Sequence, residues 1–202
     1  MKIINCYLND ISKIFELYRI ATDYMKLKKQ VAWPDFEREL IIKEIKDQRQ
    51  WKILIDNEIA CIWAITLNDE LIWGNENNEP SVYIHRIATN PDFRGRNLVK
   101  HIVGWADNYC IDNNLKYVRM DTVGLNKGLI SHYKKLGFDF LGTKELDNVE
   151  DLPEHYSEGP VCLFQRIPTK ERIINYNNRR FKPVKNSENG ETSEETIFEY
   201  NS

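Results

Sequence analysis

The chain has 202 residues, of which 42% are hydrophobic and 29% charged, and its formal net charge is -3 at pH 7. This length is sufficient for one substantial hydrophobic core and predicts a single domain, with room for an appendage. The slight net acidity argues against a general nucleic-acid-binding surface. No segment approaches the roughly 18 to 20 apolar residues that span a bilayer, and the N-terminal stretch MKIINCYLND lacks the apolar centre of a signal peptide. We therefore expect a cytoplasmic protein that binds neither nucleic acid nor membrane.

The cysteines give no sign of a metal site. They are far apart in the chain, form no CxxC pair and have no histidine nearby, and three of them fall in apolar segments that resemble strands or a helix. Buried thiols are the expected outcome, without a disulfide framework and without bound metal. The four residues are Cys6, Cys61, Cys110 and Cys162.

The N-terminal half predicts a strand, two helices and a hairpin. Residues 2–8 are typical of a strand, and apolar positions at helical spacing follow from Ile11 to Met25. A second helix is expected to run to about Gln48 after the break at Trp33-Pro34-Asp35. Residues 51–55 and 58–67 are apolar and β-branched, and the Asp56-Asn57 pair between them indicates a two-residue hairpin turn. The polar run 68–80 is expected to be a loop, in which the apolar residues Leu71, Ile72 and Trp73 either extend the previous strand or cover the core.

A basic loop between a strand and a helix is the sharpest functional signal. The strand predicted over residues 83–88 is ended by turn formers up to Pro91-Asp92. Apolar residues then recur at spacings of three and four, which predicts a helix beginning near Gly95. Arg94 and Arg96 would lie at the start of that helix, where unpaired amide groups and the helix dipole favour an anion. The pattern predicts a site for a phosphate or pyrophosphate.

The remaining elements complete one sheet. Strands are expected over residues 116–122, 138–145 and 161–167, and a short helix over 126–136 that is closed by Gly137. This order of strands and helices predicts a mixed sheet with helices packed on it, an α/β (α+β) fold. Residues 168–202 are polar and first basic, then acidic, so we expect an extension that drapes over the domain or is partly mobile.

The order of these elements resembles the Gcn5-related N-acetyltransferase superfamily. The resemblance covers residues 2–167 in element order and is specific from Tyr83 to Phe138. The loop RGRNLV (94–99) follows the family pattern only in part, because asparagine and valine stand at its two later small positions. The downstream segment DTVGLNKGLISHYKKLGF matches more fully, with Asn126 seven residues before Tyr133 and a Gly-Phe pair four residues after that tyrosine.

The resemblance implies a mostly antiparallel mixed sheet flanked by helices and a 1–167 acetyltransferase domain. It also implies acetyl-CoA as co-substrate, with its pantetheine arm along the strand Ile84 to Ala88 and its pyrophosphate on the basic loop. Tyr133 would lie near the thioester sulfur and donate a proton to the departing thiolate. The residues expected to bind the cofactor are Arg86, Ile87, Ala88, Arg94, Gly95, Arg96, Asn97, Leu98, Val99 and Asn126.

Acetyl transfer also requires that the acceptor amine lose a proton. His85 on the cofactor strand and His155 in the penultimate loop are the candidate bases, and deprotonation relayed by water without a dedicated side chain remains open. Asp121, at the end of a strand, is a candidate contact for the amine or a turn cap. We expect direct acetyl transfer to a primary amine of a small molecule or peptide, by a monomer or homodimer. The alternative is a non-catalytic acyl-CoA sensor or regulatory module.

Overall fold

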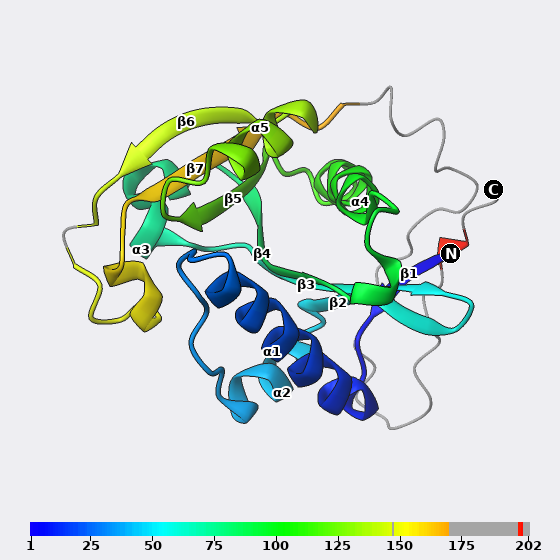
Figure 1. The fold of residues 1–202 in the computed structure, drawn as a ribbon. Helices are drawn as coiled ribbons and strands as arrows, with labels where there is room; N and C mark the ends of the chain where they lie inside the picture. Colours follow the sequence, from blue (N-terminus) through cyan, green and yellow to red (C-terminus); the bar gives the residue numbers. More distant parts are fainter. Residues whose placement is uncertain (147, 170–197, 200–202) are drawn as a thin grey trace.

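The fold is built on one mixed sheet. The computed structural model describes residues 1–146, 148–169 and 198–199. Within these ranges the sheet has the strand order β6-β7-β5-β4-β3-β2-β1-β8 (Figure 1). Neighbouring strands are antiparallel except β4 and β5, which are parallel, so the predicted mixed and mostly antiparallel sheet is confirmed. The strands are β1 (Lys2–Asn5), β2 (Gln50–Ile55), β3 (Glu58–Thr66), β4 (Ser81–Thr89), β5 (Tyr117–Val123), β6 (Asp139–Lys144), β7 (Val161–Arg166) and β8 (Phe198–Glu199).

Helices cover both faces of this sheet. The α-helices are α1 (Ile11–Leu27), α2 (Arg38–Lys46), α3 (Glu70–Trp73), α4 (Leu98–Asp112) and α5 (Lys127–Lys135). Short 3₁₀ turns are η1 (Leu8–Asp10), η2 (Gly74–Asn78), η3 (Pro91–Phe93) and η4 (Glu154–Ser157). In Figure 1, α1 and α2 lie on one side of the central strands and α4 lies on the other. None of the helices in the described part of the chain is long and apolar enough to cross a membrane.

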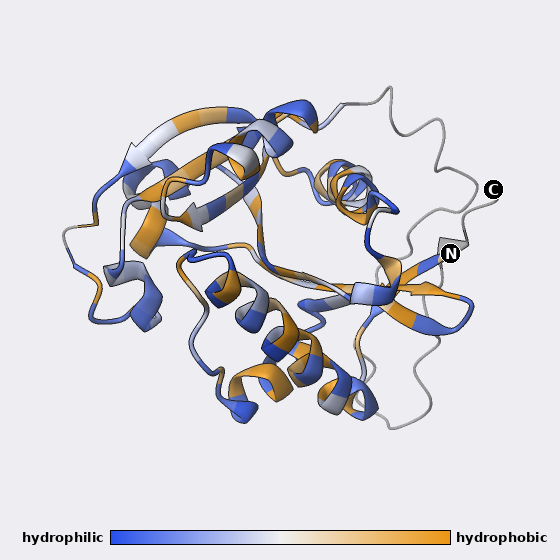
Figure 2. Ribbon diagram, in the orientation of Figure 1, coloured by the Kyte–Doolittle hydropathy of each residue, from blue (hydrophilic) through white to orange (hydrophobic). Residues whose placement is uncertain are grey.

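A tryptophan cluster forms the centre of the core beneath α4. The ring centroids of Trp51 and Trp105 are 4.6 Å apart, and those of Trp63 and Trp105 are 5.1 Å apart. Trp63 and Trp105 are fully buried, and aromatic side chains of this size bury more apolar surface than other residues. The opposite face carries a second cluster, in which Ile14 and Leu17 of α1 pack against Ile41 of α2. Figure 2 shows hydrophobic residues along the central strands and alternating with hydrophilic ones along the helices.

Two local predictions are confirmed by backbone conformation. Asp56 and Asn57 both have left-handed φ angles, 52° and 64°, as a two-residue hairpin turn requires. Gly137 has φ 86°, and the amide of Phe138 donates to the carbonyl of Tyr133 at 3.1 Å, which closes α5 in the expected way. The four cysteines are buried and free, also as predicted.

The polar segment 68–80 is more ordered than its composition indicates. It contains α3 and η2, and Ile72 and Trp73 of α3 are almost completely buried against Tyr83 of β4. The short apolar run Leu-Ile-Trp therefore covers the core, which is one of the two expected alternatives, but it does so as a helical turn and not as part of a loop. One helical turn is too short to give a periodic pattern, which is why the sequence did not reveal it.

The start of α4 also differs from the prediction. The helix begins at Leu98 and not near Gly95, because Gly95 and Asn97 adopt left-handed φ angles of 83° and 55°. A right-handed helix cannot include such residues, so the basic loop is longer than expected.

Of the C-terminal extension, the structure describes only residues 168–169 and 198–199. Phe198 and Glu199 pair with Ile3 and Lys2 on the outer edge of β1. Residues 170–197 and 200–202 lie outside the described residues, and the predicted character of the extension stays a prediction.

Candidate active site

The site begins where the two central parallel strands separate. Residues 81–84 of β4 pair with residues 117–120 of β5, and the pairing stops there. Beyond that point β4 continues along β3 as far as Thr89, and β5 continues along β7 as far as Val123. From His85 onward, the edge of β4 that faces β5 is therefore unpaired and borders the gap between the two strands (Figure 1). Such an edge presents backbone donors and acceptors to a ligand, as an unpaired strand does.

A β-bulge turns the backbone of β4 at the same place. Ala64 of β3 pairs with His85 and Ile62 pairs with Ala88, so two residues of β4 lie opposite the single Trp63. Arg86, the first of these two, has φ 52°. This angle is uncommon for a residue other than glycine and marks a backbone that its surroundings hold in place.

The side chain of Arg86 supplies that restraint. Its Nη2 atom donates to both carboxylate oxygens of Glu44 at 2.5 Å, and its guanidinium carbon lies 5.0 Å from the centre of the Phe36 ring. Glu44 also accepts from Gln50 at 2.8 Å, so residues of both α2 and β2 hold the Arg86–Glu44 ion pair in place. The Nη2 group of the guanidinium is thus engaged within the protein, while its Nε is buried without a hydrogen-bond partner among the described residues.

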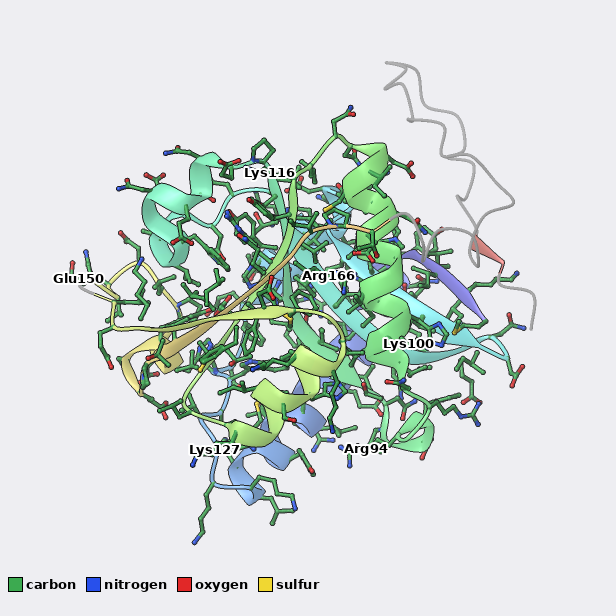
Figure 3. The ribbon with its side chains drawn as sticks, turned by 90° about the horizontal axis from the view of Figure 1, so that it is seen from above. Arg94, Lys100, Lys116, Lys127, Glu150 and Arg166 are labelled. Atoms are coloured by element: carbon green, nitrogen blue, oxygen red, sulfur yellow. The ribbon has the colours of Figure 1, made fainter. Side chains whose placement is uncertain are left out.

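The basic loop leads into α4 beside this edge. Asn97 is the N-cap of α4, but its side chain makes no capping hydrogen bond, so the first amide groups of the helix are left for other acceptors. Arg94 and Arg96 are exposed, and their guanidinium carbons lie 4.8 Å from the Tyr24 ring and 5.1 Å from the Phe93 ring. Figure 3 shows Arg94 and Lys100 near the N-terminal end of α4. The loop can receive a strongly anionic group.

The later part of the loop faces the core. Leu98 is buried, and the half-buried Val99 packs against the same cluster beneath α4. The side chain of Val99 is therefore accommodated by packing, although the family pattern has a small residue at this position.

Helix α5 contributes an amide and a phenol from the far side of the gap. The Asn126 side chain accepts from the amide of Leu129 at 3.0 Å and caps the helix, so its oxygen is occupied, while its amide nitrogen has no hydrogen-bond partner among the described residues. Tyr133 is 7% exposed and lines the cavity between β4 and β5. Its ring makes edge contacts with Phe164 at 5.2 Å and Phe138 at 6.0 Å. Burial raises the pKa of its hydroxyl, with smaller contributions from Cys61 and Asp121, so the hydroxyl stays protonated at neutral pH.

The other end of the cavity carries a cluster of acid–base groups. His85 lies between two carboxylates, with Nε2 3.5 Å from Oδ2 of Asp69 and Nδ1 3.8 Å from Oδ1 of Asp121. The hydroxyl of Tyr156 donates to the other oxygen of Asp121 at 2.8 Å. The His155 ring packs against the Tyr156 ring at a tilt of 43°, with a centroid separation of 4.5 Å, and burial lowers the pKa of His155 to about 4. Both histidines are therefore neutral at pH 7.

These elements enclose one cavity of about 1150 Å³. Its walls come from the segment between α1 and α2, the open part of β4, the basic loop, β5, α5 and η4. Trp33, on the first of these segments, packs edge-on against Tyr18 and also lines the cavity, so it serves both core and site. The volume is large enough for an extended cofactor arm together with a small acceptor.

The cavity brings together most of the residues singled out from the sequence. Tyr133, His85, His155, Asn126 and Asp121 all line it, as do Arg86 and Ile87 of β4 and the basic loop apart from Arg96. Ala88 and Arg96, both predicted to bind the cofactor, are not among the lining residues. Asp69 and Glu44 were missed. Asp69 lies in the polar segment before β4. Nothing near it in the sequence indicates that the fold places it close to His85 of β4 and Asp121 of β5. In the sequence, Glu44 looks like any other acidic residue on the exposed face of a helix.

Comparison with known proteins agrees with this arrangement. The sequence model of the Acetyltransferase (GNAT) family matches residues 14–138, from α1 to the end of α5. A curated relative, the "Uncharacterized N-acetyltransferase YesJ" of Bacillus subtilis (strain 168), is 31% identical over 74 residues. That match spans 37% of this chain and 41% of the relative, so it leaves more than half of the relative's length unmatched.

Solved structures share the fold over a larger part of the chain. A GNAT-family acetyltransferase from Listeria monocytogenes 4b F2365 superposes with a TM-score of 0.67 at 21% identity, covering 82% of this chain and 93% of that one. Another from Streptococcus agalactiae 2603 gives a TM-score of 0.65 at 23% identity and covers 83% and 95%. At these identities the similarity establishes the fold alone.

Proposed function

The chain belongs to the acetyltransferase (GNAT) family, and we propose from this membership and from its cavity that it transfers an acetyl group from acetyl-CoA to a primary amine. The single observation that carries the proposal is the opening between β4 and β5, which lies between an uncapped helix start and a buried tyrosine hydroxyl. An acyl donor with an amide-bearing arm and a pyrophosphate needs these three features in this order.

The residues present fit the donor. The open edge of β4 at Arg86, Ile87 and Ala88 offers backbone groups to the arm, and the free amide nitrogen of Asn126 faces the same cavity. The amides at the start of α4 and the side chains of Arg94 and Arg96 would receive the pyrophosphate. The donor supplies the thioester whose C–S bond breaks during transfer.

Tyr133 is proposed to protonate the departing sulfur. Attack of the amine nitrogen on the thioester carbon forms the C–N bond, and cleavage of the C–S bond releases a thiolate that needs a proton. A hydroxyl whose pKa is raised by burial is fully protonated at neutral pH and can supply it. Its position on α5 is fixed by the packing of its ring on Phe164 and by the Gly137 closure of the helix.

The proposal is tested by two measurements on the full-length protein. Isothermal titration with acetyl-CoA should show binding, and release of free thiol should then be measured against a panel of primary amines. Amine-dependent thiol release together with formation of the acetylated amine is the expected result. Tight binding without transfer to any amine would contradict the proposal and favour a non-catalytic acyl-CoA-binding module.

The basic loop gives a prediction of its own. Changing both Arg94 and Arg96 to alanine is expected to raise the Kd for acetyl-CoA by about 10- to 100-fold at low salt, since charge-assisted hydrogen bonds contribute roughly 1.5–3 kcal/mol each before screening by solvent. The loss should shrink as salt is added. Arg38→Ala removes an exposed arginine of α2 outside the cavity and serves as the matched control. Equal affinities for the double variant and this control would remove the loop from the cofactor site.

A further inference from the structure

Each nitrogen of His85 has a carboxylate oxygen within 4 Å. Nε2 is directed at Asp69 and Nδ1 at Asp121, at 3.5 and 3.8 Å. A neutral imidazole has one N–H donor and one acceptor nitrogen, and an imidazolium has two donors. In either form each nitrogen has a carboxylate to share a proton with, so His85 is suited to connect the two acids.

One arrangement of protons gives the two buried carboxylate oxygens that face His85 a partner each, at 3.5 and 3.8 Å. Oδ2 of Asp69 and Oδ1 of Asp121 are buried and have no hydrogen-bond partner within the described chain. If Asp69 is a carboxylic acid, it donates to Nε2 of His85, and Nδ1–H of His85 donates to Asp121. Tyr156 already donates to the second oxygen of Asp121 at 2.8 Å. Buried polar groups are almost always paired, which favours this continuous chain.

The electrostatic surroundings of the cluster also favour a protonated Asp69 and a neutral His85. Burial, aided by the Asp121 carboxylate, raises the pKa of Asp69 to about 8, and burial raises that of Asp121 to about 6. Burial and the nearby Arg86 and Arg49 lower the pKa of His85 to about 3. The facing groups are Asp69 from the α3 segment, Arg86 and His85 from β4, Arg49 before β2, Asp121 from β5 and Tyr156 from η4. An acid with a pKa near the working pH is an efficient general base when it is ionised.

Hydrogen bonds of its backbone groups fix the position of Asp69. Its backbone amide donates to Oδ1 of Asn77 at 2.8 Å, and the same oxygen accepts from the hydroxyl of Tyr83 at 2.9 Å. Its carbonyl accepts from the amide of Trp73 at 2.9 Å and so anchors α3. The side chain keeps 12% of its surface exposed and lines the cavity, so an acceptor can reach it.

We propose that Asp69 takes the proton from the acceptor ammonium group and that His85 links Asp69 to Asp121, so that the three side chains act as one acid–base unit. This rests on the proposed acetyl transfer. The acceptor gives one proton to the Asp69 carboxylate, and its freed lone pair forms the C–N bond. The C–S bond breaks, the sulfur takes the Tyr133 proton, and the second amine proton passes to the tyrosine and restores it. The proton held by Asp69 is then released to solvent, so that one proton leaves in each turnover. The class of acceptor that needs this step is an aliphatic primary amine, with a pKa of ~10, because it arrives protonated.

Asp69→Asn tests the assignment, with Glu70→Gln as the matched control, since Glu70 is the exposed neighbouring acid on α3. For an aliphatic amine acceptor, Asp69→Asn is expected to lower kcat by about 100-fold or more, to leave the Kd for acetyl-CoA unchanged and to remove the rise of kcat/KM with pH that ionisation of Asp69 produces. Asp69→Glu should recover part of the activity. Asp121→Asn should move that rise to lower pH, because a like charge next to Asp69 is lost.

A second measurement does not depend on turnover. The raised pKa of Asp69 means that its stabilising contribution is complete below about pH 4 and is lost as pH rises toward about 8. Asp69→Asn should therefore melt at a higher temperature than wild type at pH 8 and at nearly the same temperature at pH 4. One outcome would overturn the inference but leave the proposed function standing. In it the wild type acetylates an amine, and Asp69→Asn has a kcat within threefold of the wild-type value and the same pH profile. Failure of the wild type to acetylate any amine would overturn the proposed function, and the inference with it.

Discussion

Replacing Tyr133 by phenylalanine is expected to lower kcat for acetyl transfer by about 100-fold or more while leaving the Kd for acetyl-CoA nearly unchanged. The ring would keep its contacts with Phe138 and Phe164, so packing should be retained. Only the hydroxyl is lost, and with it the proton for the departing thiolate. Steady-state kinetics and isothermal titration on the same preparation measure the two quantities separately.

The control for this variant is another partly buried tyrosine. Tyr109 of α4 packs on Trp105 at 5.2 Å and does not line the cavity, so Tyr109→Phe removes a hydroxyl elsewhere in the core region. It should keep wild-type kcat. An unchanged kcat for Tyr133→Phe would assign the proton to another donor, and a parallel loss of cofactor affinity would indicate that the hydroxyl binds the donor instead.

The sequence predicts those parts of the fold whose conformation is determined by residues close to one another in the chain. The Asp56-Asn57 pair sets a turn because both residues tolerate left-handed backbone, and Gly137 ends α5 for the same reason. The apolar positions of α4 recur at helical spacing because one face of the helix meets the sheet, with Ile102 and Trp105 fully buried. Each of these features is determined within a few residues of chain.

The site is less predictable because it depends on where distant segments meet. The left-handed Arg86 has no local signal, since an arginine in a strand normally continues the strand, and its conformation is held by Glu44 from α2. Asp69 is likewise an ordinary loop aspartate until the separation of β4 from β5 places it beside His85. The sequence indicates His85 as a titratable group but not that a carboxylate lies within 4 Å of each of its nitrogens.

Removing the carboxylate of Asp107 is expected to destabilise the fold strongly. Asp107 of α4 and Arg166 of β7 form a two-point ion pair, with Nε to Oδ1 at 2.9 Å and Nη2 to Oδ2 at 2.8 Å, and their side chains are 0% and 3% exposed. Asp107→Ala would leave a buried guanidinium without its counter-ion, which typically costs about 3–5 kcal/mol. For a chain of this size that corresponds to a fall in Tm of roughly 10 °C, measured by thermal denaturation.

The same arginine links the two helices of the proposed cofactor site. Its Nη1 atom donates to the carbonyl of Leu136 at 2.6 Å, so Arg166 joins the end of α5 to α4 through β7 (Figure 3). The double change Asp107→Leu with Arg166→Met removes both charges and should recover much of the lost stability, because a buried pair adds little beyond what apolar packing provides. Acetyl-CoA affinity should nevertheless stay below that of wild type in the double variant, since the link to Leu136 is gone. A double variant as unstable as Asp107→Ala would show that the pair's geometry, and not the unpaired charge, carries the stability.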